Sequence, residues 1–247
     1  MIFPIGDTQV KGGFRPFISY VLLGLLFLTF IAQNFFRGKL ICTGAVIPQH
    51  IANHQDLYTL ITAQFLHGNL IHLLGNALFI WIFADNIEAG IGHVRFLAFY
   101  LLGGIIATFA HIWWGTSFDG TENCCIPCSE GAISCLRTLK ACSAYIPTLG
   151  ASGAISAVIG AYIVMYPKSR IKILVLFLFR NFYVPAWFFL VLWFLIQLVS
   201  GLGSYFKMDV SGLEGVAWWA HIGGFVFGVV MGLVFKNVYK FDPHLEE

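Results

Sequence analysis

Long runs of apolar residues, separated by short polar stretches, set the strongest limit on how this chain can fold. Of its 247 residues, 58% are hydrophobic and 11% are charged, whereas soluble domains carry about 25% charged residues. A soluble core cannot hide that much apolar surface, so we expect the chain to fold within a lipid bilayer. We predict an all-α, polytopic membrane protein with six transmembrane helices, over residues 17–36, 70–86, 94–114, 152–166, 185–199 and 218–235.

The six predicted helices form one membrane domain over residues 16–240, flanked by polar tails at 1–15 and 241–247. Several segments are shorter than the ~20 residues that a free-standing span needs, which favours a compact bundle whose helix ends are covered by protein. Between the fourth and fifth segments, the basic and apolar stretch 167–184 is interpreted as lying along the membrane surface. The net charge of +2 is too small to indicate nucleic acid as a partner.

The basic residues orient the bundle, because cytoplasmic loops carry an excess of Lys and Arg. If both termini lie on one side, that side holds nine of the 14 basic residues, and the opposite side holds five in longer loops. The acidic residues divide equally between the two sides and do not decide the orientation. We therefore predict that both termini face the cytoplasm, in the inner membrane of a cell.

All six cysteines fall in the two predicted outer loops, 37–66 and 116–149. Disulfides persist in oxidising compartments, so this clustering supports the same orientation. The CxxC within CCIPC also permits a zinc site, but the second loop contains no histidine, and disulfides are favoured. The cysteines concerned are Cys42 in the first loop and Cys124, Cys125, Cys128, Cys135 and Cys142 in the second.

Ionisable and amide side chains inside membrane spans are costly, about 2.5–3.5 kcal/mol for a charged group at a helix centre, and each needs a reason. The second span begins HGNLIHLLGN, which places His72 and Asn76 four residues apart on one helix face. His67 lies five residues before His72 and is expected near the start of that helix. We expect these side chains, with Asn69, to line a water-filled cavity.

Two of the predicted spans carry matching stripes of small residues. The last span places His221 about one turn inside an apolar helix, and Gly224 and Gly228 follow it on the same face. The fourth span begins GASGAIS, and Gly160 lies on the same face as Ser152. Helices with such stripes can pack nearly backbone to backbone. If the two stripes face each other, Ser152 and His221 meet at the outer ends of their helices.

A serine beside a neutral histidine is the chemistry of nucleophilic catalysis. The histidine takes the hydroxyl proton and can return it to a leaving amine. The oxyanion that forms then needs hydrogen-bond donors already in place. The backbone N–H of Ser152, the His72 ring and the Asn76 amide are candidate donors. The carboxylates of the second span lie at its far end, so we expect a Ser152–His221 dyad and not a triad.

Taken together, these residues resemble the rhomboid family of intramembrane serine proteases, over roughly residues 15–240. The family pattern HxxxxHxxxN on the second helix, GxSG at the start of the fourth and AHxxGxxxG on the sixth are all present. GxSG alone is a weak signal, whereas three motifs on the right three helices are a strong one. The matching residues are His67, His72 and Asn76; Gly150, Ser152 and Gly153; and Ala220, His221, Gly224 and Gly228.

The resemblance implies a six-helix bundle in which Ser152 is the nucleophile, His221 the base, and His72 and Asn76 the oxyanion donors. It implies that single-span membrane proteins are the substrates, cut in or near the bilayer, with no metal or cofactor. It also implies that the first outer loop is a structured element partly sunk in the outer leaflet. Supporting roles fall to Gly150, Gly153 and His67 in the site, and to Gly160, Gly224 and Gly228 in helix packing.

Two positions depart from the family pattern. Tyr58-Thr59 stands where members often carry Trp-Arg in the first loop. Ser156 stands where an aromatic residue often packs on the catalytic histidine, and Trp218 or Trp219 is expected to take over that contact.

Two other functions stay open from the sequence. A transporter or channel with a histidine-lined pathway should show two related halves, and the sequence contains no internal repeat. An inactive rhomboid-like protein that binds transmembrane helices typically lacks the serine or the histidine, whereas this chain has both.

Overall fold

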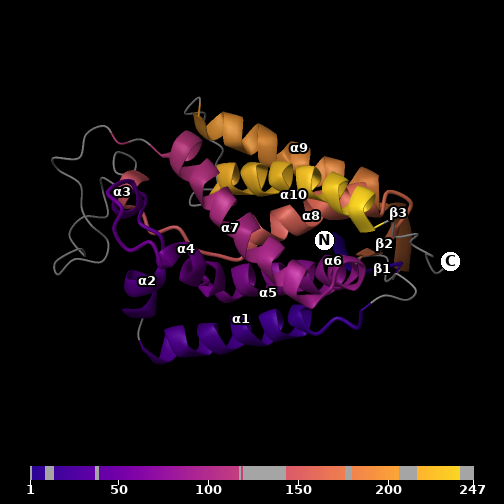
Figure 1. The fold of residues 1–247 in the computed structure, drawn as a ribbon, viewed down its shortest axis with the longest axis horizontal. Helices are drawn as coiled ribbons and strands as arrows, with labels where there is room; N and C mark the ends of the chain where they lie inside the picture. Colours follow the sequence, from indigo (N-terminus) through magenta and orange to yellow (C-terminus); the bar gives the residue numbers. More distant parts are fainter. Residues whose placement is uncertain are drawn as a thin grey trace.

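A computed structural model describes residues 2–8, 14–36, 39–116, 118, 143–175, 180–205 and 216–239. Figure 1 shows a bundle of helices, which confirms the predicted all-α membrane fold. Among the described residues, five helices are long and apolar enough to cross a membrane. They are α1 (Ile18–Phe35), the helix Leu70–Ile91, α7 (His93–Gly115), α9 (Ala186–Tyr205) and α10 (Trp218–Tyr239).

The second of these helices is continuous but not uniform. It consists of α5 (Leu70–Phe79), a π-helical turn (Ile80–Ala84) and α6 (Asp85–Ile91). It therefore extends five residues beyond the predicted end at residue 86. The side chain of Asn69 accepts a hydrogen bond from the His72 backbone N–H at 2.8 Å and caps its start.

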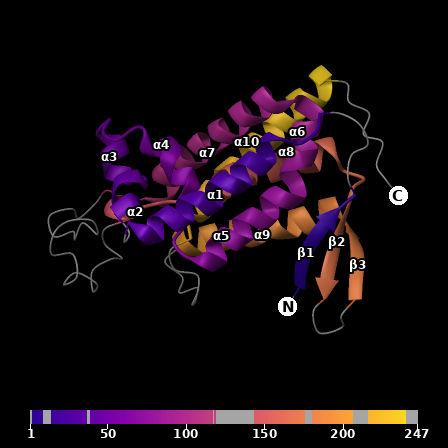
Figure 2. The same ribbon diagram turned by 90° about the horizontal axis from the view of Figure 1, so that it is seen from below.

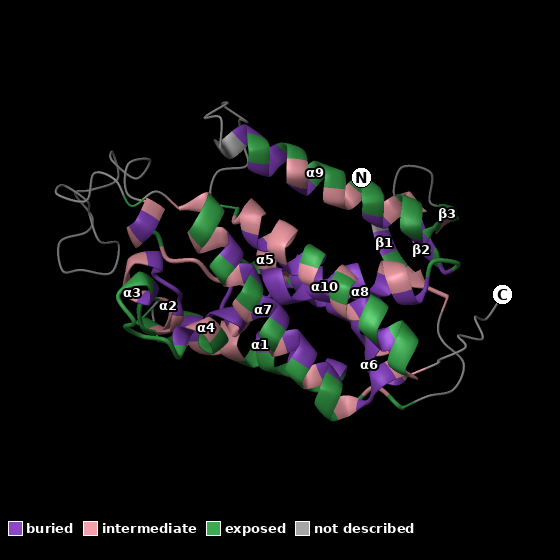
Figure 3. Ribbon diagram, turned by 45° about the horizontal axis from the view of Figure 1, so that its top comes forward, coloured by how far each residue is buried: buried purple, intermediate pink, exposed green. Residues whose placement is uncertain are grey.

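The remaining helix, α8 (Ser152–Met165), corresponds to the fourth predicted span. It is shorter than the other five and lies in the middle of the bundle. Its 14 residues extend about 21 Å, less than the ~30 Å of a hydrocarbon core. Eleven of the 14 are buried, which explains why α8 is apolar on every face. Figure 3 shows α8 buried among its neighbours, while α9 has a fully exposed side. A short span is possible here because protein covers it.

The stripes of small residues on α8 and α10 face each other, as predicted. A β-carbon on Gly228 would lie 2.0 Å from the carbonyl oxygen of Ala157, closer than any real contact. A β-carbon on Gly160 would lie 2.2 Å from the carbonyl oxygen of Phe225, and one on Gly224 would also be 2.2 Å from a carbonyl of α8. The two backbones touch directly, so these positions accept no side chain.

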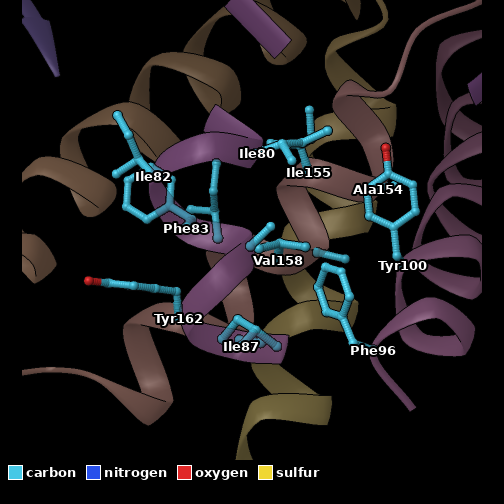
Figure 4. Close-up of a cluster of buried hydrophobic side chains, with 14 of the residues drawn as sticks. Ile80, Ile82, Phe83, Ile87, Phe96, Tyr100, Ala154, Ile155, Val158 and Tyr162 are labelled. Carbon is cyan, nitrogen blue, oxygen red and sulfur yellow. The ribbon is translucent and has the colours of Figure 1, made fainter. Parts of the chain in front are cut away.

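The apolar core lies between the helix Leu70–Ile91, α7 and α8 (Figure 4). Phe83 and Tyr162 meet edge to face with ring centroids 4.9 Å apart. Further buried members of this cluster are Ile80, Ile87, Phe96, Tyr100, Ile155 and Val158.

A small antiparallel sheet, which the sequence analysis does not predict, lies at one end of the bundle (Figures 1 and 2). Its strands are β1 (Ile2–Asp7), β2 (Arg170–Val175) and β3 (Arg180–Pro185), in the order β1-β2-β3. The stretch 167–184, interpreted as a surface-lying segment, thus forms a strand pair, as its β-branched and aromatic residues favour. Strand β1 therefore occupies residues 2–7 of the segment 1–15, predicted to be a polar tail.

The side chain of Asp7 attaches β1 to the bundle. Its carboxylate accepts hydrogen bonds from the Asn86 amide at 2.9 Å and from the Tyr162 hydroxyl. The Thr8 backbone N–H donates to the Arg170 carbonyl oxygen at 3.0 Å. Burial raises the pKa of Asp7 to about 6, so this contact responds to pH in the physiological range.

Glu88 joins the start of α1 to α6. Its fully buried carboxylate accepts hydrogen bonds from the backbone N–H groups of Phe17, Ile18 and Ser19 at 2.7–2.9 Å. These N–H groups have no partner within the helix, and a negative charge is favourable there. The ring of His93 adds a contact of 2.5 Å. Glu88 is therefore a structural residue, far along its helix from the candidate site.

The first outer loop is structured, as expected. It contains α2 (Lys39–Gly44), α3 (Pro48–Ala52), α4 (Thr59–Thr62) and a 3₁₀ turn at Ala63–Phe65. The loop lies at the opposite end of the molecule from the sheet (Figure 1).

Hydrogen bonds of Tyr58 and Val46 hold this loop in place. The Tyr58 hydroxyl donates to the Thr43 carbonyl oxygen at 2.9 Å, and Val46 pairs with Thr148 in a short β-bridge. Cys42 is disulfide-bonded, in agreement with the favoured disulfide prediction. The predicted pairing of the other five cysteines lies outside the described residues.

Candidate active site

Gly150 sets the approach of the chain to α8. Its φ of +127° is one that L side chains rarely adopt. A β-carbon there would also lie 2.7 Å from Cε1 of His72. Glycine is needed on both counts, and the turn that follows makes Ser152 the first residue of α8. Gly153 in turn lets α7 approach, since a β-carbon there would lie 2.6 Å from Cβ of Ala107.

The structure brings together the predicted serine and histidine. Oγ of Ser152 lies 2.8 Å from Nε2 of His221, which belongs to the first turn of α10. This is the distance of a hydrogen bond between a hydroxyl and an imidazole nitrogen. The contact follows from the packing of α8 on α10, because the two glycine stripes fix the register of the helices.

Aromatic rings enclose His221. The ring of Trp218 meets it edge to face at 6.1 Å, and the ring of Trp193 from α9 lies at the same distance with an interplanar angle of 34°. Of the two expected tryptophans, Trp218 makes the contact, whereas Trp219 stacks on Trp114 at 6.2 Å. Trp193 is an addition that the sequence pattern does not indicate.

The second ring nitrogen of His221 has a partner that the sequence analysis misses. Nδ1 of His221 lies 2.8 Å from Oε1 of Gln197, on α9. Gln197 is 5% exposed. The available signal was an amide inside the predicted fifth span, where an unsatisfied polar group is costly.

Ser156, which stands where family members often carry an aromatic residue, makes its hydrogen bond within α8. Its hydroxyl donates to the Ser152 carbonyl oxygen at 2.7 Å, within α8. A hydroxyl that bonds to the preceding turn needs no partner from another helix.

The predicted oxyanion donors lie on the other side of the serine. A β-carbon at Gly150 would be 2.9 Å from Nε2 of His72 and 3.8 Å from Nδ2 of Asn76, so both side chains lie beside the backbone that leads into Ser152. Asn69, expected to line the same cavity, instead caps the helix.

His67 holds the Asn76 amide in place. Nδ2 of Asn76 lies 2.9 Å from Nε2 of His67, and Nδ1 of His67 lies 3.3 Å from the Phe65 carbonyl oxygen. The carbonyl oxygen requires a proton on Nδ1, which leaves Nε2 free to accept from the amide. Burial, and then the neighbouring His72, lowers the pKa of His67 to about 4, so this ring stays neutral near pH 7. The backbone of His67 is bonded at both N–H and C=O to Gln33 of α1.

A small cavity of about 30 Å³ opens beside Ser152 and Gly150, with Gln64 and Thr108 in its wall. A water molecule needs roughly 10–15 Å³ measured in this way. Nε2 of Gln64 donates to two backbone carbonyl oxygens, and its buried Oε1 has no partner among the described residues. The cavity therefore has room for a water molecule.

The described residues contain no group of three His, Cys, Asp or Glu side chains placed to bind a metal ion. The chemistry available at this site is that of a serine, a histidine and neutral hydrogen-bond donors.

Comparison with known proteins adds the decisive observation: a family model, the Rhomboid domain, matches residues 54–238. The chain belongs to the rhomboid family. The match contains all three motifs and takes in every helix that contributes to the serine–histidine site.

Several curated relatives are rhomboid-like proteins. Presenilin-associated rhomboid-like protein A, mitochondrial, of Danio rerio is 28% identical over 176 residues, covering 69% of this chain and 35% of the relative. RHOMBOID-like protein 12, mitochondrial, of Arabidopsis thaliana is 24% identical over 225 residues, covering 90% and 60%. Rhomboid-like protease 5 of Toxoplasma gondii is 25% identical over 203 residues, covering 80% and 18%. The chain thus spans about a third of the length of the animal relative.

Proposed function

We propose that this rhomboid is an intramembrane serine protease that cleaves single-span membrane proteins in or near the bilayer. The observation that carries the proposal is the 2.8 Å contact between Ser152 Oγ and His221 Nε2. The His72 ring and the Asn76 amide lie beside Gly150, two residues before the serine, which supports their proposed role as oxyanion donors. One relative is itself named a protease.

The first half of the reaction forms an acyl-enzyme. Nε2 of His221 accepts the Ser152 hydroxyl proton as Oγ attacks the substrate carbonyl carbon. The carbonyl oxygen becomes negative and accepts hydrogen bonds from the Ser152 N–H, the His72 ring and the Asn76 amide. His221 then passes its proton to the leaving amine, and the C–N bond breaks.

The second half needs one water molecule. We propose that a water molecule in the cavity beside Ser152 attacks the acyl carbon. His221 takes a proton from this water and returns it to Oγ of Ser152, which releases the new carboxylate. The cavity thus supplies water to a site that lies among apolar helices.

The two alternatives have less support. An inactive helix-binding protein has no need of a serine and a histidine within hydrogen-bond distance, or of donors beside them. A transporter needs a pathway across the bilayer, whereas small residues pack α8 against α10 without space between the backbones.

We also propose an orientation for the chain in the membrane. The start of β1 and the end of α10 lie at the same end of the bundle, away from the first outer loop (Figures 1 and 2). With the excess of basic residues at that end, both termini are proposed to be cytoplasmic and the site to open on the other side. The inner membrane of a cell stays a prediction; two relatives are named as mitochondrial.

The test of the nucleophile is labelling with a fluorophosphonate, which reacts with an activated serine. The parent protein is expected to be labelled once, at Ser152. Ser152→Ala should abolish labelling and His221→Ala should reduce it at least about 100-fold, because the base is lost. Ser200→Ala, which removes another buried hydroxyl from α9, is the matched control and should label normally. Equal labelling of the parent and Ser152→Ala would rule out the proposed nucleophile.

A further inference from the structure

Gln197 stands out because it is a buried amide on a helix that is otherwise apolar and half exposed to lipid. The buried positions of α9 include Ala186, Leu190, Gln197 and Ser200. Burying an amide away from water costs about 1–3 kcal/mol unless it is hydrogen-bonded. The contacts of its two polar atoms therefore indicate what the side chain is for.

The contacts of Gln197 fix which way its amide points. Nε2 donates to the carbonyl oxygen of Trp193, one turn earlier in α9, at 3.1 Å. Oε1 faces Nδ1 of His221 at 2.8 Å. With the amide turned round, the oxygen would face the Trp193 carbonyl oxygen, two acceptors in contact. The hydrogen-bond network thus selects the orientation with Oε1 toward the histidine.

This orientation also fixes the tautomer of His221. An amide oxygen only accepts hydrogen bonds, so Nδ1 of His221 must carry the proton. In a neutral imidazole the other nitrogen, Nε2, then carries the lone pair. Nε2 is the atom that faces Ser152 Oγ at 2.8 Å. Three hydrogen bonds thus run in one direction. The Ser152 hydroxyl donates to Nε2 of His221, Nδ1–H of His221 donates to Oε1 of Gln197, and Nε2 of Gln197 donates to the Trp193 carbonyl oxygen.

We propose that Gln197 is a positioning residue of this site, which holds His221 in the tautomer and orientation that allow it to act as a base. This inference rests on the proposed protease function. The site is then a Ser152–His221–Gln197 arrangement rather than the bare dyad that the sequence predicts. Gln197 touches neither the substrate nor the reacting atoms and acts through His221.

An amide suits this role within a membrane. A carboxylate in the same place would accept from Nδ1 more strongly, but a charged side chain inside a helix bundle in lipid is costly. A neutral amide provides the acceptor without that cost. Trp193, whose backbone carbonyl accepts the hydrogen bond from the Gln197 amide, also places its ring beside the imidazole of His221. The helix α9 thus controls both the tilt and the protonation site of His221.

The first test observes the tautomer directly and needs no activity. The ring nitrogens of His221 are recorded by ¹⁵N NMR in the full-length protein at about pH 8, with His221→Gln used to assign the signals. The expected result is a proton on Nδ1 in the parent and a mixture of tautomers in Gln197→Met, which keeps the size but removes the acceptor. A parent signal with the proton on Nε2 would overturn the proposal, whether or not the protein proves to be a protease.

The second test measures the rate of fluorophosphonate labelling against pH in four proteins: the parent, Gln197→Met, Gln197→Glu and the control Ser200→Ala. His72 and His111 are the titratable side chains that interact with His221, and they are unchanged throughout. Gln197→Met should label about 10- to 100-fold more slowly at the plateau, because much of its His221 presents the wrong nitrogen. Gln197→Glu should restore the rate and move the midpoint of the profile to higher pH, since a carboxylate favours the charged imidazolium.

These results separate positioning from mere packing. Parental rates and midpoints in Gln197→Met would contradict the inference, and so would equal loss of rate in Gln197→Glu and Gln197→Met with unchanged midpoints. If the parent itself fails to label while its NMR spectrum shows the Nδ1 proton, the proposed function is wrong and the role of Gln197 in setting the tautomer stands.

Discussion

At the candidate site, the chemical nature of each polar group determines which partner donates and which accepts in its hydrogen bonds. Asn76 illustrates this, because one of its amide protons goes to Nε2 of His67 and the other stays available for an oxyanion. Nε2 of His67 can accept this hydrogen bond because the proton of the ring is on Nδ1, which faces the Phe65 carbonyl oxygen. The Asn76 amide, a candidate oxyanion donor, is therefore oriented before a substrate arrives, which is the condition for effective electrostatic stabilisation.

His72→Ala and Asn76→Ala are each predicted to slow cleavage with little effect on folding. Loss of one oxyanion donor typically costs about 10²–10³ in kcat. In each single variant two of the three proposed donors remain, so cleavage should slow without being abolished. Single-turnover rates on a model single-span substrate measure the effect, with thermal unfolding as a control for folding. If the double variant turned over as fast as the parent, both side chains would be removed from the site.

Much of this site could be predicted from local helix registers. Residues four apart share a helix face, which placed His72 beside Asn76, and the glycine stripes set Ser152 opposite His221. Gln197 could not be found in this way, because α9 is apolar around most of its circumference and no local pattern fixes its rotation. Its partner His221 lies 24 residues away, on another helix.

Helices α8 and α10 are the elements that determine the site, because direct contact of their backbones fixes their relative position. The sheet at the other end was missed for a related reason. The partner of β2 comes from the start of the chain, where Ile2 pairs with Val175. Pairing over that separation is not encoded in any short stretch of sequence.

Gly228→Ala is predicted to destabilise the protein by about 1–3 kcal/mol, the usual cost of overpacking. Its new β-carbon would lie 2.0 Å from the Ala157 carbonyl oxygen and would push α10 away from α8. Fluorophosphonate labelling should fall as well, since the separation moves His221 from Ser152. The matched control is Gly24→Ala in α1, where a β-carbon would meet nothing within 4 Å and should stabilise the helix slightly. Equal unfolding temperatures for the two variants would contradict the packing.

The attachment of β1 is predicted to weaken as the pH rises. The folded-state pKa of Asp7, about 6, is above the ordinary aspartate value of 3.8. A carboxyl with a raised pKa contributes stability that is complete below its unfolded value and is lost as the pH rises through the folded value. Hydrogen exchange of Ile2–Asp7, compared between the parent and Asp7→Asn at each pH, measures this. Protection in the parent should fall relative to Asp7→Asn as the pH rises from about 4 to about 6.5, and an unchanged ratio would contradict the prediction.

At the scale of the whole molecule, the candidate site lies within the bundle, and Cys42, which is disulfide-bonded, lies in the first outer loop. Closing a loop of about 15 residues with a disulfide contributes roughly 3 kcal/mol in the chain-entropy model. The Ser152–His221 contact depends instead on helix packing. The covalent link and the site are thus separate sources of order.

Reduction of the disulfides is therefore predicted to lower the unfolding temperature while leaving the rate of fluorophosphonate labelling nearly unchanged. Alkylation with mass counting, before and after reductant, verifies the starting state in protein made in an oxidising compartment. Six freely alkylated thiols before reduction would refute the disulfide prediction and reopen the metal alternative. Loss of labelling on reduction would show that the site depends on the outer loops.

The central claim is that this rhomboid cuts membrane-spanning substrates with Ser152, and it is tested most directly by cleavage in a reconstituted bilayer. Purified parent, Ser152→Ala and the control Ser200→Ala are each placed in proteoliposomes with a labelled single-span protein, and the products are identified by mass. We predict one discrete cut in or near the span, made by the parent and by Ser200→Ala, and no product with Ser152→Ala. Cleavage by Ser152→Ala at the parental rate would contradict the account.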